Sequence, residues 1–343
     1  MPFNLQRYPS NEQPQPILTP RDGVDWESVA VFNPCVVYDN GIFRMLYRTY
    51  PAKTKGVKQK TIRPGFHLIY QKSYIGYAES KDGIHFERRN DPFISPDKPF
   101  DMYGCEDPRI TKIGDVFYIT YTAIDSPLED KTKTPNVRIA LATTKDFATV
   151  IKHGIIGPPT TSKAGALFSE PVNGGKIGFI MTISSDSTNS HVAVRYYDSI
   201  DDVTNQSDES WKKFLDHSME TAVLKTYWWL LRGPELGAPP IKTEKGWLLI
   251  YSAESMSHVW TITAALTDLN EPHKLIARAP GFLLQPVTDY ERNGLVPQVT
   301  FPSGAVVVED QLYVYYGGAD TVIGLATCKL DELLDYLEQF RGK

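Results

Sequence analysis

Two short segments carry polar side chains where a β-strand would ordinarily be apolar. The first contains Asn33, and the second contains Glu106, Asp107 and Arg109. Asn33 and Asp107 each precede a proline, and each lies eight residues before a residue of the following tight turn, Gly41 and Asp115 respectively. A proline restricts the backbone around it, so these matched positions predict two equivalent strand starts that face the same space. The alternative is that an aspartate before a proline only caps a turn.

A second matched set follows the tyrosines that end the next strand of each segment. Arg48 comes directly after such a tyrosine, Glu254 comes three residues after another, and Asp320 follows the run YYGGA. If both strand ends reach one rim, Arg48, Asp107, Glu254 and Asp320 converge on one cavity. Carboxylates beside an arginine and aromatic rings suit a carbohydrate site. A carboxylic acid there could protonate a leaving oxygen, and a carboxylate could activate water.

Other kinds of chemistry have little support in the sequence. No Ser–His or Cys–His nucleophile and no phosphate-cradling glycine loop is recognisable. The seven histidines have no metal-site spacing, so we expect neither a metal nor a cofactor. A net charge of −5 lacks the basic footprint of a nucleic-acid-binding protein. No apolar run approaches the length of a membrane span.

The cellular setting is predicted from the cysteines and the N-terminus. Cys35, Cys105 and Cys328 are odd in number and widely spaced, which favours a reducing compartment over a disulfide framework. The first residues contain no apolar stretch typical of a secretory signal. We therefore expect a cytoplasmic protein. The Pro-rich N-terminal arm and a C-terminal helix could mediate contacts in a homo-oligomer.

The elements that would position these residues form a repeat. A strand, a tight turn and a second strand recur with turn markers at Gly41, Gly114, Gly174, Gly246 and Asp310, about 67 residues apart. A further strand pair continues each unit, as in YIGYAESKDGIHFERR. Four strands in each of five units predict an all-β protein, a five-bladed β-propeller. A large sandwich of irregular hairpins is the alternative.

The predicted propeller fills the whole chain, 1–343, as one domain. We expect the blades at about 30–97, 104–160, 163–205, 235–287 and 296–330. The last unit ends early, so an N-terminal strand is expected to complete it and close the ring. The segment 331–340 has apolar residues at helical spacing, which predicts a short C-terminal helix. The basic insert at 53–72 is either a solvated loop or a flap over the propeller mouth.

These motifs also resemble a known family. VFNPCVVYDNGIFRMLYR, GCEDPRIT, KAGALFSE, GAPPIKTEKGWLLIYS and LYVYYGGADTVIGLA are similar to segments of glycoside hydrolase family 130, which contains β-mannoside phosphorylases and β-1,2-mannosidases. The resemblance covers all five predicted blades. It implies a five-bladed propeller and an enzyme that inverts the configuration of the anomeric carbon. It implies that Asp107 is the general acid. It also implies that Asn33, Arg48, Arg109 and Asp320 hold the sugar. Glu106, which precedes Asp107 in the EDPR motif, is expected to bind substrate as well.

The chain departs from the phosphorylases of that family where they bind phosphate. Those enzymes carry a lysine before the ALFP-like run, a His-Arg pair on the next strand and a histidine in a YHG motif, which together form a cationic pocket. Here the lysine remains as Lys163. The His-Arg pair aligns with Met181-Thr182, and the histidine aligns with Ser252.

This loss of positive charge favours hydrolysis over phosphorolysis. Glu254, close to the missing histidine, would repel phosphate and could serve as the catalytic base, with Glu235 as the next candidate. The chain is thus expected to be an inverting, exo-acting glycosidase of β-linked mannosides, most simply 1,2-linked. Arg138 or Lys225 could instead replace the missing charges, so a phosphorylase that uses inorganic phosphate as co-substrate is the alternative. A sugar-binding propeller without turnover is the third reading.

Overall fold

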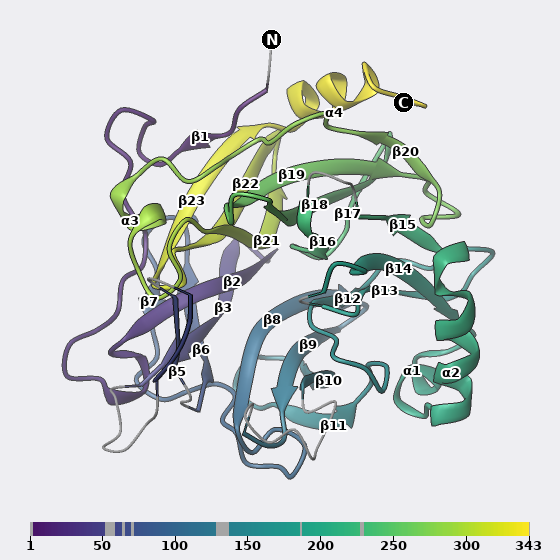
Figure 1. Ribbon diagram of the computed structural model, residues 1–343, viewed down its shortest axis with the longest axis horizontal. Coiled ribbons are helices and arrows are strands. Elements are labelled where there is room, and N and C mark those ends of the chain that lie inside the picture. The colour runs from purple at the N-terminus through teal and green to yellow at the C-terminus, as the bar shows by residue number, and fades with distance from the viewer. Residues whose placement is uncertain are drawn as a thin grey trace.

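The structure is a computed structural model that describes residues 3–51, 59–63, 66–69, 72–127, 137–185, 187–226 and 230–342. Five sheets surround a central axis as the blades of a β-propeller (Figure 1), as the repeat predicts. No helix within these ranges is long and apolar enough to span a membrane. The predicted insert 53–72 lies partly outside the described residues. Its described backbone forms a hairpin of β4 (Gln59–Arg63) and β5 (Phe66–Ile69).

Each blade begins at the axis with its first strand and continues outward by antiparallel pairing. The first blade contains β2 (Ala30–Asp39), β3 (Ile42–Tyr50), β6 (Tyr74–Ser80) and β7 (Glu87–Arg88). The second contains β8 (Gly104–Ile113), β9 (Val116–Ile124), β10 (Val137–Thr144) and β11 (Ile151–Ile155). The turn between β2 and β3 has positive φ at Asn40 and Gly41, the pair that a tight hairpin turn requires.

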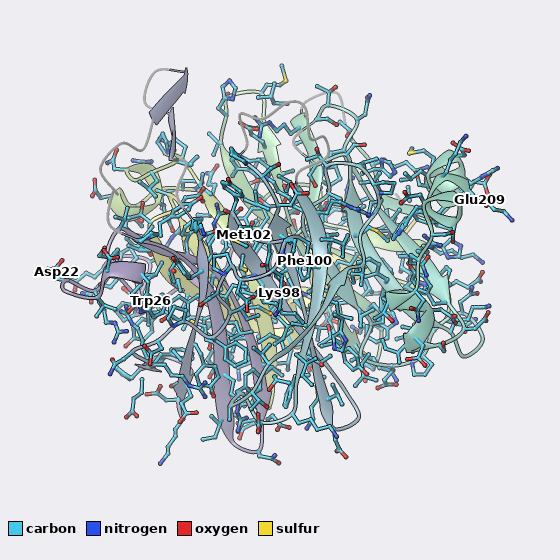
Figure 2. All side chains as sticks on the ribbon, turned by 90° about the horizontal axis from the view of Figure 1, so that it is seen from below. Asp22, Trp26, Lys98, Phe100, Met102 and Glu209 are labelled. Carbon is cyan, nitrogen blue, oxygen red and sulfur yellow. The ribbon has the colours of Figure 1, made fainter. Side chains whose placement is uncertain are left out.

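The third blade extends further than the predicted range 163–205. It contains β12 (Gly165–Leu167), β13 (Ile177–Ile183), β14 (His191–Tyr197) and β15 (Ala222–Leu224). Between its last two strands lie the helices α1 (Ile200–Thr204), α2 (Asp208–His217) and η2 (Ser218–Glu220). Ser199 and Ser207 cap the two α-helices. These helices lie at the edge of the molecule, and Glu209 of α2 lies across it from Asp22 and Trp26 (Figure 2).

The last two blades carry the remaining elements. The fourth contains β16 (Leu230–Leu236), β17 (Ile241–Thr243), β18 (Gly246–Ser255), β19 (Trp260–Thr267) and β20 (Leu275–Arg278). The fifth contains β21 (Thr300–Val308), β22 (Gln311–Gly318), β23 (Val322–Lys329) and β1 (Gln6–Arg7). Because β1 pairs with β23, the N-terminal strand completes the last sheet, which is the closure that the short fifth repeat predicts. Helices η1 (Asp25–Glu27) and α3 (Asp289–Arg292) lie in the connections.

The hydrophobic core is divided into layers between neighbouring blades. Alternate residues of one strand face opposite layers. On β10, Ala140 and Ala142 pack toward the first blade, whereas Ile139 and Leu141 pack toward the third. The predicted C-terminal helix is present as α4 (Leu330–Glu338), whose leucines bury against blades four and five. This layered core holds the inner strands rigidly around the axis, where the site lies.

Candidate functional site

The first strands of three blades share a bulge that contains a proline. The register of β2, β8 and β16 shifts at Asn33-Pro34, Asp107-Pro108 and Gly233-Pro234 respectively. A bulge bends the strand and redirects a side chain. Asn33 and Asp107 adopt left-handed φ angles of 46° and 49°, a strained conformation that Asn and Asp tolerate best. The sequence analysis did not match Gly233-Pro234 to the other two pairs, because the hairpin of blade four is longer and the pair lies farther from its turn. Pro234 was the signal that could have identified it.

Asn33, Arg48, Glu106 and Asp107 form one buried network. Asn33 donates its Nδ2 to Asp107 Oδ1 at 2.9 Å, and Arg48 Nη1 donates to the same oxygen at 3.2 Å. Arg48 Nη2 donates to Glu106 Oε1 at 2.6 Å, and Ser73 Oγ donates to that oxygen at 3.0 Å. The two strand ends therefore meet, as the matched positions predict. Ser73, which precedes β6, carried no recognisable signal in the sequence.

Two aromatic rings hold the guanidinium of Arg48 in place. Its Cζ lies 4.7 Å from the ring centroid of Phe32 and 4.9 Å from that of Tyr50, and its Nη2 also donates to the Tyr50 hydroxyl. Such stacking adds a cation–π attraction to the ion pairs. The arginine is therefore fixed in orientation before any ligand arrives.

Some buried polar atoms at this centre have no partner among the described residues. They are Asn33 Oδ1, Arg48 Nε and Ser303 Oγ. Ser303 lies at the register shift of β21, the corresponding position in the fifth blade. A buried polar group without a partner is costly. These atoms therefore indicate a ligand that supplies both acceptors and donors, as the hydroxyl groups of a sugar do.

Charges around Asp107 favour its ionised form. Burial alone would raise the pKa of this carboxyl, but the positive charge of Arg48 and the hydrogen bond from Asn33 outweigh it, so the pKa is lowered. Arg109 and Lys163 act in the same direction. The positive charge of Lys163 also acts to lower the pKa of Asp320. Lys163 therefore lies close enough to both carboxylates to affect their acidity.

The pKa values of Glu106 and Asp320 are raised, in contrast to that of Asp107. Burial raises the pKa of Glu106, assisted by the charge of Asp107 and opposed by Arg48. Burial raises the pKa of Asp320 to about 7. Asp320, like Asn33 and Asp107, has a left-handed backbone, with φ at 50°. The centre thus combines carboxyl groups of different acidity, which is typical of acid–base sites.

Arg109 does not turn its guanidinium toward this network. The side chain is fully buried, and it donates to the carbonyl oxygens of Gly237, Leu236 and Asp107 at 2.7, 2.8 and 2.9 Å. Its bonds to blade four favour a structural link across the axis, and its predicted contact with the sugar stays a prediction. Glu235 is buried, and its charge acts on Arg109.

Glu254 lies against an arginine and a histidine of its own blade. It is 1% exposed, and its Oε2 lies 3.1 Å from Arg232 Nε, while its Oε1 lies 2.9 Å from His258 Nδ1. The negative charge that the sequence analysis placed here is therefore balanced by Arg232. The role of catalytic base for Glu254 or Glu235 stays a prediction.

Within the described ranges, no three His, Cys, Asp or Glu side chains are arranged to hold a metal ion. The arrangement can bind a polyol, donate hydrogen bonds to an anion through Arg48 or Lys163, and move a proton through its carboxyl groups.

Comparison with known proteins agrees with this geometry. A family model described as beta-1,4-mannooligosaccharide phosphorylase matches residues 11–339. A 1,2-beta-oligomannan phosphorylase of Thermoanaerobacter sp. (strain X514) is 35% identical over 321 residues, 93% of this chain and 96% of that protein. A beta-1,2-mannobiose phosphorylase of the same organism is also 35% identical, over 319 residues and the same shares. The solved beta-1,2-mannobiose phosphorylase of Listeria innocua superposes with a TM-score of 0.76 at 26% identity, covering 98% of this chain and all of that one.

Proposed function

The chain belongs to glycoside hydrolase family 130, and from this premise we propose that it is an inverting phosphorylase of β-1,2-linked mannosides. Phosphate attacks the anomeric carbon of the non-reducing mannose, and the glycosidic C–O bond breaks. The leaving oxygen takes a proton. The products are α-mannose 1-phosphate and a mannoside shorter by one sugar.

This proposal replaces hydrolysis, the function that the sequence analysis favoured. Both relatives with 35% identity are named as phosphorylases, one of oligomannan and one of mannobiose. They cover nearly the whole chain, including every blade that contributes to the site. These relatives therefore support phosphorolysis, the alternative in the sequence analysis, better than hydrolysis.

The observation that carries the proposal is the ion pairing of Glu254. Hydrolysis was inferred because Met181-Thr182 and Ser252 replace the family's phosphate-binding cations, and because the Glu254 carboxylate would repel phosphate. Arg232 and His258 instead lie against its two oxygens, so the carboxylate brings no uncompensated negative charge. With Lys163 acting on the carboxylates at the axis, the centre retains cations that can attract an anion.

Asp107 is the proton donor in this proposal. Its lowered pKa means that it is ionised at neutral pH before substrate binds. A bound phosphate adds negative charge nearby, and negative charge raises the pKa of a neighbouring carboxyl. We therefore expect Asp107 to acquire its proton as phosphate binds. Asn33, Arg48 and Asp320 hold the mannose through its hydroxyl groups.

The test is to incubate the purified protein with β-1,2-mannobiose with and without inorganic phosphate. Phosphate-dependent release of α-mannose 1-phosphate is the expected result. Release of free mannose at the same rate without phosphate would restore hydrolysis. Tight binding of the disaccharide without any product would point to a sugar-binding propeller.

A further inference from the structure

Thr182 of β13 lies where three blades meet beside the axial centre, and its side chain is buried. We propose that Thr182 is a positioning residue of this centre. It holds the segment that carries Lys163. Through Leu236 and Arg109 it also holds the strand that carries Asp107. The inference rests on the proposed function and adds to it a residue that acts on the reaction through other residues.

The main chain of Thr182 fixes the segment around Lys163. Thr182 N donates to the carbonyl of Ala164 at 3.0 Å, and Ser162 Oγ donates to the carbonyl of Thr182 at 2.6 Å. Both partners are buried, and they flank Lys163 on either side. Ala164 has a left-handed φ of 52°, which is uncommon for a residue with a Cβ and persists only where the surroundings enforce it. The two bonds to Thr182 therefore hold Lys163 in place.

The side chain of Thr182 holds a segment of blade four. Its Oγ1 accepts a hydrogen bond from Leu236 N at 2.9 Å. The carbonyl of the same leucine accepts Arg109 Nη2 of blade two at 2.8 Å. The next residue, Gly237, packs so closely against the carbonyl of Pro302 in blade five that a Cβ would not fit there. This short segment is thus confined by blades two, three and five at once.

Arg109 transmits this constraint to the proton donor. Its Nε donates to the carbonyl of Gly237 at 2.7 Å, and its Nη1 donates to the carbonyl of Asp107 at 2.9 Å. A guanidinium group is planar and rigid, so a shift of its acceptors in blade four also shifts the nitrogen that bonds Asp107. That residue has a strained φ of 49°, and the direction of its carboxyl depends on the main chain there.

The two ends of this chain of hydrogen bonds serve the same reaction. The positive charge of Lys163 acts on the carboxyl of Asp107, so the two groups are electrostatically coupled. In the proposed function Lys163 attracts phosphate and Asp107 supplies the proton. Misplacing such groups by about 1 Å can cost about 100-fold in rate. Thr182 therefore contributes to turnover by fixing both groups relative to each other.

The experiment measures kcat and the KM values for β-1,2-mannobiose and inorganic phosphate in variants that each break one contact. Thr182→Val keeps the shape of the side chain but leaves Leu236 N without its acceptor, so kcat should fall by about ten- to thirtyfold. Thr182→Ser keeps the hydroxyl and should stay within about threefold of wild type. Ser162→Ala loosens the Lys163 segment, so it should raise the phosphate KM by about three- to tenfold and leave the mannobiose KM unchanged.

Thr111→Val is the matched control. Thr111 is also a buried threonine, and its Oγ1 also links two blades, because it donates to the carbonyl of Leu167 at 3.1 Å. It lies in β8, farther from the axial centre along the strand than Asp107. Urea denaturation should show a similar loss of stability in Thr111→Val and Thr182→Val, while kcat and both KM values of Thr111→Val stay at the wild-type level.

Equal kinetics in Thr182→Val and Thr111→Val would overturn the proposal, because the Thr182 hydroxyl would then only stabilise the fold. A loss of kcat that Thr182→Ser shares would overturn it as well. If the valine variant does not fold, Thr182→Cys replaces it, since sulfur is a weak acceptor, and the same fall in kcat is expected.

Failure of the proposed function is distinct, because the wild-type enzyme would then form no mannose 1-phosphate. If it releases free mannose instead, the same variants are compared by that rate, since hydrolysis needs the same acid. A wild-type protein that turns over neither way would overturn the positioning role too.

Discussion

At the scale of single residues, the site depends on side chains held at strained backbone positions. Asn33, Asp107 and Asp320 all have left-handed φ angles. Such strain persists only where the surrounding structure enforces it, and here the proline-containing bulges and the buried network do so. Each residue thereby presents a polar group to the axis at a fixed angle, which is the preorganisation that a sugar site requires.

Asp107→Asn is expected to abolish turnover while the protein stays folded. The amide fills the same space but cannot donate a proton as an acid does, so kcat should fall by roughly 10²- to 10⁴-fold. Mannose 1-phosphate release measures the loss, and circular dichroism checks the fold. Asp115→Asn is the control, since Asp115 lies exposed in the turn of the same hairpin. Near-normal turnover by Asp107→Asn would remove Asp107 from the acid role.

Asp320→Asn should change how stability depends on pH. The folded protein holds the Asp320 proton up to pH about 7, whereas the unfolded chain releases it near the ordinary value of about 4. The free energy of unfolding that depends on this group is therefore largest below pH 4 and declines as pH rises to 7. The asparagine variant lacks that decline, so relative to wild type it should gain about 3–4 kcal/mol between pH 4 and pH 8.

Urea denaturation of both proteins at several pH values measures this difference. If Asp320→Asn shows a difference that stays constant with pH, the pKa of the Asp320 carboxyl is not shifted in the folded protein.

At the scale of elements, the strands are joined by buried polar links as well as by apolar packing. Arg109 of β8 bonds two carbonyl groups of the GPELG segment in blade four. Three second strands use another link: Tyr47, Tyr121 and Tyr316 donate their hydroxyls to Glu27, Asp101 and Glu291 at 2.8, 2.9 and 2.8 Å. Each carboxylate lies 20 or 25 residues earlier in the chain. The segment entering each of these blades is thus tied to its second strand.

Arg109→Met is expected to destabilise the protein by about 2–4 kcal/mol. The methionine fills much of the space, but carbonyl groups of two blades lose their donor, and Glu235 loses a neighbouring positive charge. Urea denaturation measures the change. Arg341→Met is a suitable control, because Arg341 pairs with Glu338 on the surface, where such pairs contribute little. Equal small losses in both variants would contradict a linking role for Arg109.

At the scale of the whole molecule, the ring is closed by a few residues of the N-terminal arm. β1 is two residues long. Its Arg7 forms a bidentate ion pair with Glu291, from Nε to Oε1 at 2.7 Å and from Nη2 to Oε2 at 3.1 Å. Glu291 is fully buried, and it also accepts the Tyr316 hydroxyl. The closure therefore joins the first strand to the connection between the last two blades through a buried ion pair.

Arg7→Met should open the ring more easily and lower the free energy of unfolding by about 3–5 kcal/mol, because Glu291 is left buried without its cation. Hydrogen exchange should show that β1 and β23 lose protection before the inner strands do. Arg341→Met again serves as the surface control. Uniform protection across the fifth blade, with no loss of stability, would show that the strand pairing alone closes the ring.

The sequence by itself determined the repeat, the propeller and the position of the acidic centre. Turn residues and the proline-marked polar positions are local signals, and they recur in register because each blade repeats the same hairpin. Asn33, Arg48 and Asp107 therefore meet as predicted, whereas Glu254, which was predicted to join them, pairs with Arg232 and His258 of its own blade. Blade three was harder to delimit, because its helices separate the last strand from the other three.

Only the tertiary structure decided which partner each buried charge has. Three such contacts do not follow from the spacing of residues along the chain. They are the bonds of Arg109 to blade four, the pairing of Glu254 with Arg232 and His258, and the ion pair of Arg7 with Glu291 that closes the ring. A carboxylate read alone looks like a base that repels anions. Beside Arg232 the same carboxylate brings no uncompensated negative charge, and the proposed phosphorolysis rests on this contact.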